Sequence, residues 1–226
     1  MSCVVVQGRI YPEILPGILS TYRDFPNKIA STWTTEDPVS IEILRQNGFK
    51  LIVQDPPEHK TPTNYMSKSM LRGLDLAESL GFTHVFRMRA DVSCNKFSRI
   101  VNILENEYSP LKLSFIMLCR NHPDSEAYLC DHIIYGPISE QRKYWSAYQP
   151  PGDTRYSEAV LQEEYFNIPT VQMSYEFVKD KVQFFINRCY REGIEFHFTK
   201  PGYVEQGDLV KRYLWWNKES SLALQG

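Results

Sequence analysis

The sequence predicts an α/β fold with a mainly parallel central sheet flanked by helices. Two observations support this. Short apolar, β-prone runs alternate with segments of helical periodicity along the first half of the chain, and successive runs lie roughly 20 or more residues apart. Strands spaced in this way need crossover connections, which are right-handed and place helices on both faces of the sheet.

Seven segments are predicted as strands, because they are short, rich in β-branched or aromatic residues and mostly followed by turn-forming or polar residues. In chain order they are Cys3–Gln7, Lys28–Trp33, Phe49–Val53, a run within Phe82–Val92, Leu111–Cys119, Asp131–Gly136 and Ile194–Phe198. Helices are predicted where apolar residues recur every three or four positions. These are a segment ending near Tyr22, then Ile41–Arg45, Asn64–Leu80 with Asn64 as N-cap, Lys96–Glu107, Ser157–Asn167 with Ser157 as cap, and Glu176–Arg188.

The composition indicates a folded globular protein. Of 226 residues, 42% are hydrophobic and 13% aromatic, which suffices for a substantial core, and we expect one domain over residues 1–226 because no linker-like gap interrupts the pattern before the C-terminal third. The net charge of −2 argues against non-specific nucleic-acid binding, which needs clustered Lys and Arg.

The cysteines and the apolar runs bear on location. Five scattered cysteines without a CxxC pair fit reduced thiols better than disulfides or a zinc site. No run approaches a membrane span, and Met1 leads into a strand without a basic leader. We therefore expect a cytoplasmic protein without a transmembrane segment.

The stretch Phe82–Val92 carries the strongest functional signal. Its strand ends in Arg89-Ala90-Asp91, and ligands of open α/β sheets bind outside the carboxyl ends of strands. A carboxylate flanked by Arg87 and Arg89 suits a divalent cation that bridges to phosphate. An Asp that caps the next helix or pairs with an arginine is an equally good interpretation.

Other strand ends offer further ligand-binding candidates. Gln7, Gly8 and Arg9 lie at the tip of the first strand, where a glycine lets the backbone approach a ligand closely, although a plain turn also explains Gly8. Asp55 follows the third strand and could accept hydrogen bonds from a ribose or a base, or form a turn before proline. Lys68 and Arg72 share a helix face that could clamp a diphosphate or remain solvated.

Three later residues are candidates for acid, base or metal chemistry. Asp131 precedes His132, and a carboxylate near an imidazole can abstract a proton, although a structural Asp is as plausible. Glu163 lies on a predicted helix that could face a cleft or solvent. His197, within a short strand, could complete a metal site or simply pack.

Taken together, the run Val4 to Ile10, Ser31-Thr32-Trp33, the helix from Asn64 and the run Arg87 to Val92 resemble the WavE-like lipopolysaccharide-synthesis proteins. The order of elements is also similar to that of the small glycosyltransferases encoded by chlorella viruses, which would place the protein in a host cytoplasm. The resemblance covers roughly Cys3 to Phe166, and the order and spacing of the motifs carry it.

The resemblance implies a GT-A glycosyltransferase fold, with a nucleotide-sugar-binding half over residues 1–92 and an acceptor-side half over 93–226. It implies transfer of a hexose from a nucleotide diphosphate sugar, with a UDP-sugar favoured, to a glycan acceptor, with Mn²⁺ or Mg²⁺ as cofactor. Arg89-Ala90-Asp91 occupies the position of the family's DxD motif, so Asp91 alone would bind the metal from this motif. Gln7, Gly8, Arg9 and Thr34 match strand tips near the nucleotide, and Asp55 matches a position near the base.

In glycosyl transfer, cations stabilise the leaving diphosphate, and a carboxylate deprotonates the acceptor if the configuration inverts. Asp131 is the first candidate for this base and Glu163 the second. Two other functions stay open. A nucleotidyltransferase would share the fold but normally shows a Gly-rich, basic signature that Gln7-Gly8-Arg9-Ile10 lacks. A carbohydrate- or nucleotide-binding module would use aromatic platforms, here Trp33, Trp145, Tyr148, Trp215 and Trp216.

Overall fold

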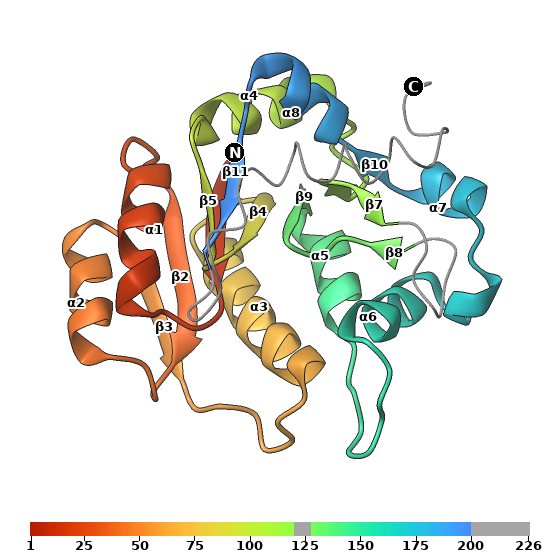
Figure 1. Cartoon of the computed structure of the whole chain (residues 1–226), viewed down its shortest axis with the longest axis horizontal. Coiled ribbons are helices and arrows are strands. Elements are labelled where there is room, and N and C mark those ends of the chain that lie inside the picture. The colour runs from red at the N-terminus through yellow and green to blue at the C-terminus, as the bar shows by residue number, and fades with distance from the viewer. Residues whose placement is uncertain (120–127, 200–226) are drawn as a thin grey trace.

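The structure, a computed structural model, describes residues 1–119 and 128–199 (Figure 1). Its strands are β1 Ser2–Gln7, β2 Lys28–Trp33, β3 Lys50–Gln54, β4 His84–Arg89, β5 Val92–Cys94, β6 Ser114–Phe115, β7 Leu118–Cys119, β8 Tyr128–Leu129, β9 Ile133–Pro137, β10 Gln183–Phe184 and β11 Phe196–Phe198. Its α-helices are α1 Leu15–Thr21, α2 Pro38–Gln46, α3 Pro62–Ser79, α4 Phe97–Glu107, α5 Ile138–Trp145, α6 Ser157–Phe166, α7 Tyr175–Lys181 and α8 Ile186–Glu192. Two short 3₁₀ turns, Pro12–Ile14 and Thr170–Gln172, complete the described elements.

A seven-stranded sheet in the order β10-β6-β9-β4-β1-β2-β3 forms the centre of the molecule. β1 pairs in parallel with both β2 and β4, and β2 pairs in parallel with β3. Only β9 runs against its neighbours within this sheet, because it pairs antiparallel with β4 and β6. The predicted α/β class, with a mainly parallel sheet flanked by helices, is confirmed.

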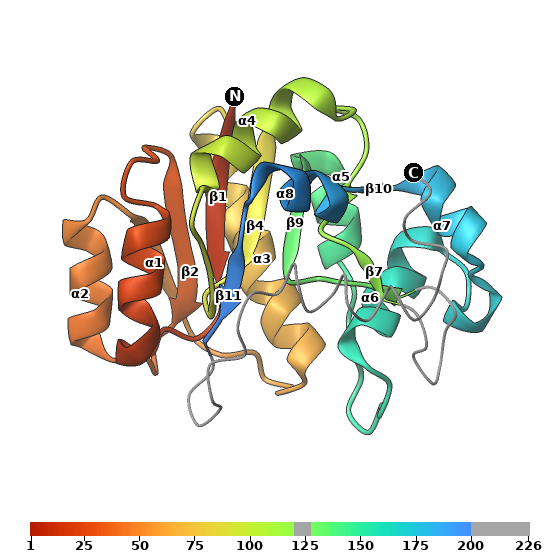
Figure 2. The same cartoon turned by 45° about the horizontal axis from the view of Figure 1, so that its top comes forward.

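The pleat of β1 sends its side chains alternately into two cores. Val4 and Val6 face a cluster formed with α1, α4 and α8, whereas Cys3 and Val5 face a cluster formed with α3, α5 and α6. Figures 1 and 2 show these helices on the two sides of the sheet. The continuous apolar run of the first strand is explained because both of its faces are buried.

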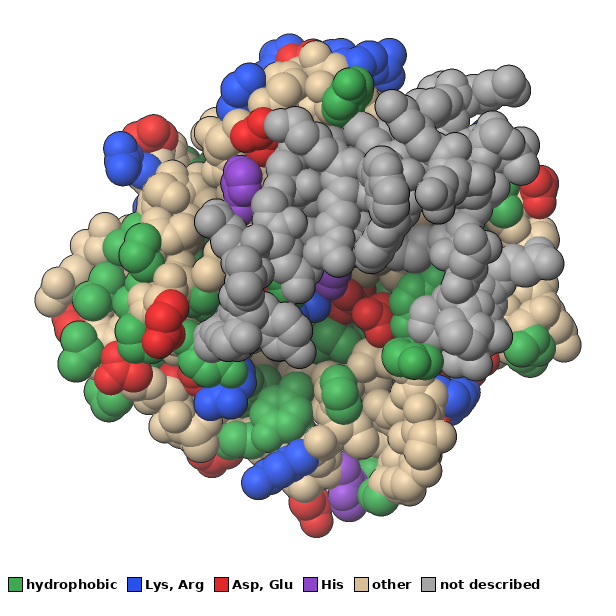
Figure 3. Space-filling view, in the orientation of Figure 1, with side chains coloured by type: hydrophobic (Ala, Val, Ile, Leu, Met, Phe, Trp, Pro, Cys, Tyr) green, Lys and Arg blue, Asp and Glu red, His purple; other side chains and the backbone are tan. Residues whose placement is uncertain are grey.

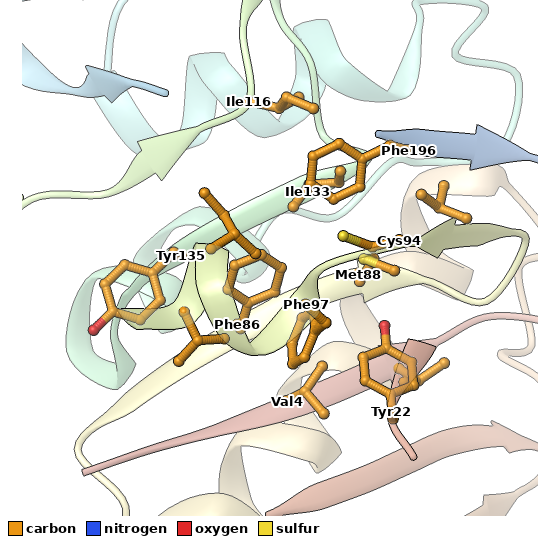
Figure 4. Close-up of a cluster of buried hydrophobic side chains, with 14 of the residues drawn as sticks. Val4, Tyr22, Phe86, Met88, Cys94, Phe97, Ile116, Ile133, Tyr135 and Phe196 are labelled. Atoms are coloured by element: carbon orange, nitrogen blue, oxygen red, sulfur yellow. The ribbon is translucent and has the colours of Figure 1, made fainter. Parts of the chain in front are cut away.

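Aromatic rings join the sheet to its helices in the first of these cores. Phe97 of α4 packs edge-on against Phe86 of β4, with ring centres 4.9 Å apart, and against Tyr22, 4.7 Å apart (Figure 4). On the opposite face Gly73 lets α3 approach β1 closely, because a Cβ there would lie 2.6 Å from Cγ1 of Val5. This close approach brings the start of α3 to the carboxyl edge of the sheet.

Several predicted boundaries are wrong for local reasons. α3 begins at Pro62, and Thr61 rather than Asn64 caps it by accepting a hydrogen bond from the Asn64 N–H at 3.2 Å. The N-cap of α6 is Tyr156, so Ser157 is its first helical residue instead of its cap. Proline at the first helical position is favourable because it has no N–H to satisfy.

Larger errors occur in the second half of the chain. The predicted helix Glu176–Arg188 is interrupted by β10, whose Gln183 N–H bonds to the Leu113 carbonyl at 2.9 Å and extends the sheet beside β6. The predicted strand Leu111–Cys119 is divided into β6 and β7. α5 was not predicted, because its buried face contains the polar Gln141 and its hydrophobic periodicity is weak.

Within the described residues, none of the helices has the length and hydrophobicity of a membrane span.

Candidate functional site

A cavity of about 760 Å³ opens at the carboxyl ends of β1, β2 and β4, the edge at which open α/β sheets bind ligands. Figure 3 shows acidic side chains in the hollowed centre of one face of the molecule. The lining residues are Gln7, Gly8, Arg9, Trp33, Thr35, Pro56, Lys60, Pro62, Tyr65, Met66, Ser69, Arg87, Arg89, Asp131, Ser157 and Glu158. Four of them are cationic and two are carboxylates, so the cavity suits an anionic ligand.

One wall of the cavity is aromatic. Trp33 at the end of β2 and Tyr65 of α3 meet edge-to-face with ring centres 5.0 Å apart. Thr35, Pro56 and Lys60 complete this wall. The sheet order places β2 and β3 on one side of β1 and places β4 and β9 on the other, so this wall lies away from the two carboxylates. A planar ring such as a nucleobase fits against such a surface.

The turn after β1 forms the middle of the cavity. Gly8 has a φ of 126°, a conformation that favours glycine, and its carbonyl accepts a hydrogen bond from the Thr32 hydroxyl at 2.8 Å. Arg9 follows with its side chain 59% exposed and its Nε 3.3 Å from Glu36. An adjoining cavity of about 250 Å³ shares Gly8, Arg9 and Arg89 with the first. Two guanidinium groups therefore border both spaces.

Gln7 has a structural role beneath this turn. Its amide donates to the Met66 carbonyl at 2.9 Å and to the Ser69 hydroxyl at 2.7 Å, and its Oε1 accepts from Arg87 Nε at 2.7 Å. Because both of its polar atoms are engaged, Gln7 ties β1 to α3 and β4. Gln7 therefore lines the cavity with a side-chain amide whose nitrogen and oxygen both bond to other protein groups.

Arg87 and Asp131 form a buried ion pair at the other wall. Both side chains are at most 2% exposed, and Nη2 of Arg87 lies 3.7 Å from Oδ2 of Asp131. Among the residues that the structure describes, Nη1 of Arg87 and Oδ2 of Asp131 have no hydrogen-bond partner, although buried polar atoms are normally paired. Burial lowers the pKa of Arg87, and Asp131 opposes this effect. A buried donor and a buried acceptor thus lie unpaired behind the cavity wall.

Glu158, in the first turn of α6, is the second carboxylate of this wall. Its Oε2 accepts a hydrogen bond from the Tyr128 hydroxyl at 2.8 Å. Burial raises its pKa above the ordinary 4.5, the charge of Asp131 raises it further, and the Tyr128 hydrogen bond and Arg89 act in the opposite direction. A carboxyl group with raised proton affinity in a cavity is typical of acid–base sites.

Asp91, the predicted metal ligand, is engaged by its neighbour. Arg89 donates from Nε to Oδ1 at 3.0 Å and from Nη2 to Oδ2 at 2.7 Å, and its guanidinium lies over the Phe198 ring at 5.1 Å. Of the two cavities described above, Asp91 lines the smaller. Across residues 1–119 and 128–199, no group of three or more His, Cys, Asp or Glu side chains could hold a metal ion. The residues in this arrangement therefore do not fit a Mn²⁺ or Mg²⁺ site.

Four predicted nucleotide ligands lie outside both cavities. Thr34 and Asp55 are exposed and bond to each other, hydroxyl to Oδ1, at 2.9 Å, whereas their neighbours Thr35 and Pro56 line the main cavity. Lys68 points its Nζ toward the Pro56 carbonyl at 3.4 Å. Arg72 is 65% exposed and 3.9 Å from Asp75. The predicted phosphate-clamping pair is thus not brought to the cavity.

Two other candidates are also placed elsewhere. Glu163 accepts hydrogen bonds from the N–H and hydroxyl of Thr170 at 2.8 and 2.7 Å and pairs with Arg155, so it anchors the turn after α6. His197 lies on β11, opposite Ser93 of β5, with Nε2 3.7 Å from Glu195. Neither side chain lines either cavity described above.

Sequence reasoning missed several residues that line the cavity. Tyr65 lies within the predicted helix Asn64–Leu80 but is not one of its periodic apolar residues, and Lys60 lies in the proline-rich segment before that helix, which is predicted as an exposed loop. Glu158 opens a predicted helix, but nothing local distinguishes it from the acidic residues further along. Trp215 and Trp216, considered as stacking platforms, lie outside the described residues.

Comparison with known proteins gives distant structural neighbours. No family model and no curated protein matches the chain, so the WavE-like resemblance is not confirmed. A cytidylyltransferase from Leptospira borgpetersenii is 16% identical, covering 74% of this chain and 71% of that one, with a TM-score of 0.44. A glycosyltransferase involved in glycosylation of the major capsid of PBCV-1, a chlorella virus, is 11% identical over 80% and 79%, with a TM-score of 0.41.

A third neighbour is core-mannan synthase A from Aspergillus fumigatus in a Mn/GDP form, 11% identical over 86% of this chain and 73% of that one, with a TM-score of 0.47. These identities and scores are too low to transfer an activity. The function of this chain is therefore derived from its own residues.

Proposed function

We propose that this protein is a glycosyltransferase that moves a hexose from a nucleotide diphosphate sugar, with a UDP-sugar as first candidate, to a glycan acceptor. The observation that carries the proposal is the composition of the main cavity along the sheet. An aromatic wall, a cationic middle and an acidic far wall follow one another in the order of a nucleoside, a diphosphate and a sugar.

The cationic middle suits the diphosphate. Arg9 and Arg89 both border the cavity and present guanidinium N–H groups, which match phosphate oxygens in charge and geometry. Gly8 leaves the backbone open at the same place, because it lacks a side chain. In glycosyl transfer this part of the site would stabilise the charge that develops on the leaving diphosphate.

The acidic wall suits the sugar and the acceptor. A guanidinium and a carboxylate side by side, here Arg87 and Asp131, can donate to and accept from sugar hydroxyls. If the configuration inverts, a carboxylate must also remove the proton of the acceptor hydroxyl. Asp131, the first predicted base, lines this wall together with Glu158, which is therefore a second candidate. Glu163, the other predicted base, does not line the cavity.

Bound Mn²⁺ or Mg²⁺ would supply further charge stabilisation for the diphosphate. Asp91 is the residue predicted to hold it, and its carboxylate is turned to Arg89 instead. No step of the proposed transfer is therefore assigned to a metal ion.

The proposal is tested by titrating UDP, GDP, CDP and a panel of nucleotide sugars into the protein by calorimetry, with and without Mn²⁺. Each donor that binds is then followed for slow release of free sugar and nucleoside diphosphate. We expect one class of donor to bind and to be hydrolysed. Arg9→Gln should weaken binding, whereas Arg72→Gln, a matched change on an exposed arginine outside the cavity, should not.

The rival functions give different results in the same assays. A nucleotidyltransferase would release pyrophosphate from a nucleoside triphosphate and a sugar phosphate. A binding module would bind a nucleotide or a glycan tightly without turnover. Either result, or the failure of every nucleotide to bind, would overturn the proposal.

A further inference from the structure

Glu158 has the surroundings of a proton acceptor. Its carboxylate lines the main cavity and has one oxygen, Oε2, fixed by the Tyr128 hydroxyl at 2.8 Å. The other oxygen, Oε1, accepts no hydrogen bond from another described residue, and the backbone N–H of Glu158 itself also favours the ionised carboxylate. The Tyr128 hydrogen bond thus orients the group at the wall of the cavity, where a ligand hydroxyl can meet it.

Asp131 is already engaged at the same wall. It is the counter-ion of Arg87, which is fully buried, and the two groups lie 3.7 Å apart. A buried guanidinium without a compensating charge is costly in a protein interior. Asp131 is therefore better understood as the partner of Arg87 than as the group that meets the acceptor.

The charged and titratable groups that face Glu158 come from four neighbouring segments. They are Tyr128 of β8, Asp131 just before β9, Arg89 of β4 and Tyr144 of α5. Burial is the largest influence on the pKa of Glu158, and the charge of Asp131 adds to it, so the pKa of Glu158 is raised. The carboxylate form is consequently a stronger base than an exposed glutamate.

We propose that Glu158 is the catalytic base of the transfer and that Asp131 is a positioning residue that strengthens it, an inference that rests on the proposed function. Oε1 of Glu158 takes the proton of the acceptor hydroxyl, and the oxygen lone pair forms a bond to the anomeric carbon. The bond from that carbon to the diphosphate oxygen breaks, and its electron pair leaves with the diphosphate beside Arg9 and Arg89. A single displacement of this kind inverts the anomeric configuration.

The test uses hydrolysis of the donor that the binding panel selects from UDP-glucose, UDP-galactose, UDP-N-acetylglucosamine and GDP-mannose, so that water serves as acceptor. Glu158→Gln should lower kcat by about 10²–10⁴-fold, the usual contribution of a general base, while the KM for the donor stays unchanged. Glu164→Gln, on the same helix but exposed, should leave both values unchanged. Thermal unfolding of both variants checks that the fold is retained.

The pH profile separates a base from a merely structural residue. The wild-type kcat should rise with pH through an acid limb above 4.5, because only the ionised form of a carboxyl with raised pKa is active. Tyr128→Phe removes a hydrogen bond that favours the ionised form, so the limb should move to higher pH. Asp131→Asn removes a neighbouring negative charge, so the limb should move to lower pH.

The outcomes distinguish a failure of the Glu158 assignment from a failure of the proposed function. If no nucleotide sugar is bound or hydrolysed by the wild type, both proposals fail. If the wild type hydrolyses a donor but Glu158→Gln retains its kcat, or the Tyr128→Phe limb does not move, only the assignment of Glu158 fails. A product with retained configuration, read by NMR, would also overturn it.

Discussion

Both carboxylate oxygens of Asp91 are held by the guanidinium of Arg89, two positions earlier in the chain, at 3.0 and 2.7 Å. Burial is the largest single influence and favours the neutral form of Arg89, but the charges of Asp91 and Asp131 together with the hydrogen bond to Asp91 outweigh it, so the pKa of Arg89 is raised. Charge-assisted, bidentate pairs of this kind are among the stronger hydrogen bonds in proteins. A divalent cation at Asp91 would compete with Arg89 for this carboxylate.

This relationship predicts the effect of removing the arginine. Arg89→Gln should strengthen the binding of Mn²⁺ in the absence of nucleotide by about tenfold, or roughly 1.4 kcal/mol, because the carboxylate no longer has a competing cation. Calorimetric titration with Mn²⁺ measures this. Adding Asp91→Asn to Arg89→Gln should abolish the gain. If Arg89→Gln binds Mn²⁺ no better than the wild type, the pair does not control access to Asp91.

The buried pair of Arg87 and Asp131 predicts a strong stability effect. Arg87→Met should lower the free energy of unfolding by about 3–5 kcal/mol, because it leaves Asp131 charged and uncompensated in the interior. The double variant Arg87→Met with Asp131→Asn should recover part of the loss. Urea denaturation measures all of these variants.

The control for the buried pair is Arg72→Met. Arg72 is 65% exposed, so this change should alter the free energy of unfolding by less than about 0.5 kcal/mol. A loss for Arg87→Met as small as that of the control would show that the buried pair is not coupled.

The contact of Gly73 with Val5 predicts the effect of Gly73→Ala on stability, and this effect is opposite to the one that helix propensity alone would predict. Alanine is favoured over glycine inside a helix by about 1 kcal/mol. At position 73, however, the new Cβ would lie 2.6 Å from Cγ1 of Val5, and overpacking of this kind costs typically about 1–3 kcal/mol. Gly73→Ala should therefore destabilise the protein in urea, and Val5→Ala in the same chain should relieve the clash. A stabilised Gly73→Ala variant would contradict the packing of α3 on β1.

The parts of the fold that could be predicted are those in which neighbouring residues act together. The apolar runs of β1 and β4 and the periodicity of α3 follow from burial on two faces or on one, which a single sequence displays directly. The rule that ligands bind at the carboxyl edge of a parallel sheet then places Gln7, Gly8 and Arg9 beside the cavity, where they lie. The elements that were not predicted depend on contacts between segments that are distant in the sequence. The docking of β10 beside β6 is an example.

The position of single side chains relative to the cavity is hard to predict for a related reason. Thr34 and Asp55 lie one position away from Thr35 and Pro56, which line the cavity. All four residues follow the ends of β2 and β3, where the alternation of a strand no longer fixes the direction of a side chain. Glu163 and Glu158 lie five positions apart on α6, which turns their side chains about 140° apart. The sequence shows that both are acidic, but the face of α6 that meets the cavity is set by packing against α3 and α5.

The aromatic wall predicts where the nucleobase binds. Tyr65 is half-buried, meets Trp33 at 5.0 Å and lines the cavity, so its ring is available to a planar ligand. Base–aromatic stacking is worth about 1–3 kcal/mol per base. Tyr65→Ala should therefore weaken the binding of the nucleoside diphosphate by roughly 10–100-fold in calorimetry, the equivalent of that energy. Tyr65→Phe, which keeps the ring, should bind as the wild type does.

The matched control for the aromatic wall is Tyr148→Ala. Tyr148 is an exposed tyrosine that is absent from the cavity lining and contacts only the His59 ring, at 6.1 Å, among described aromatic groups. The Tyr148→Ala variant should bind the nucleotide with unchanged affinity, because a nucleoside at the aromatic wall does not reach position 148. If Tyr148→Ala weakened binding and Tyr65→Ala did not, the base would bind outside the cavity. The order of nucleoside, diphosphate and sugar along the sheet would then be wrong.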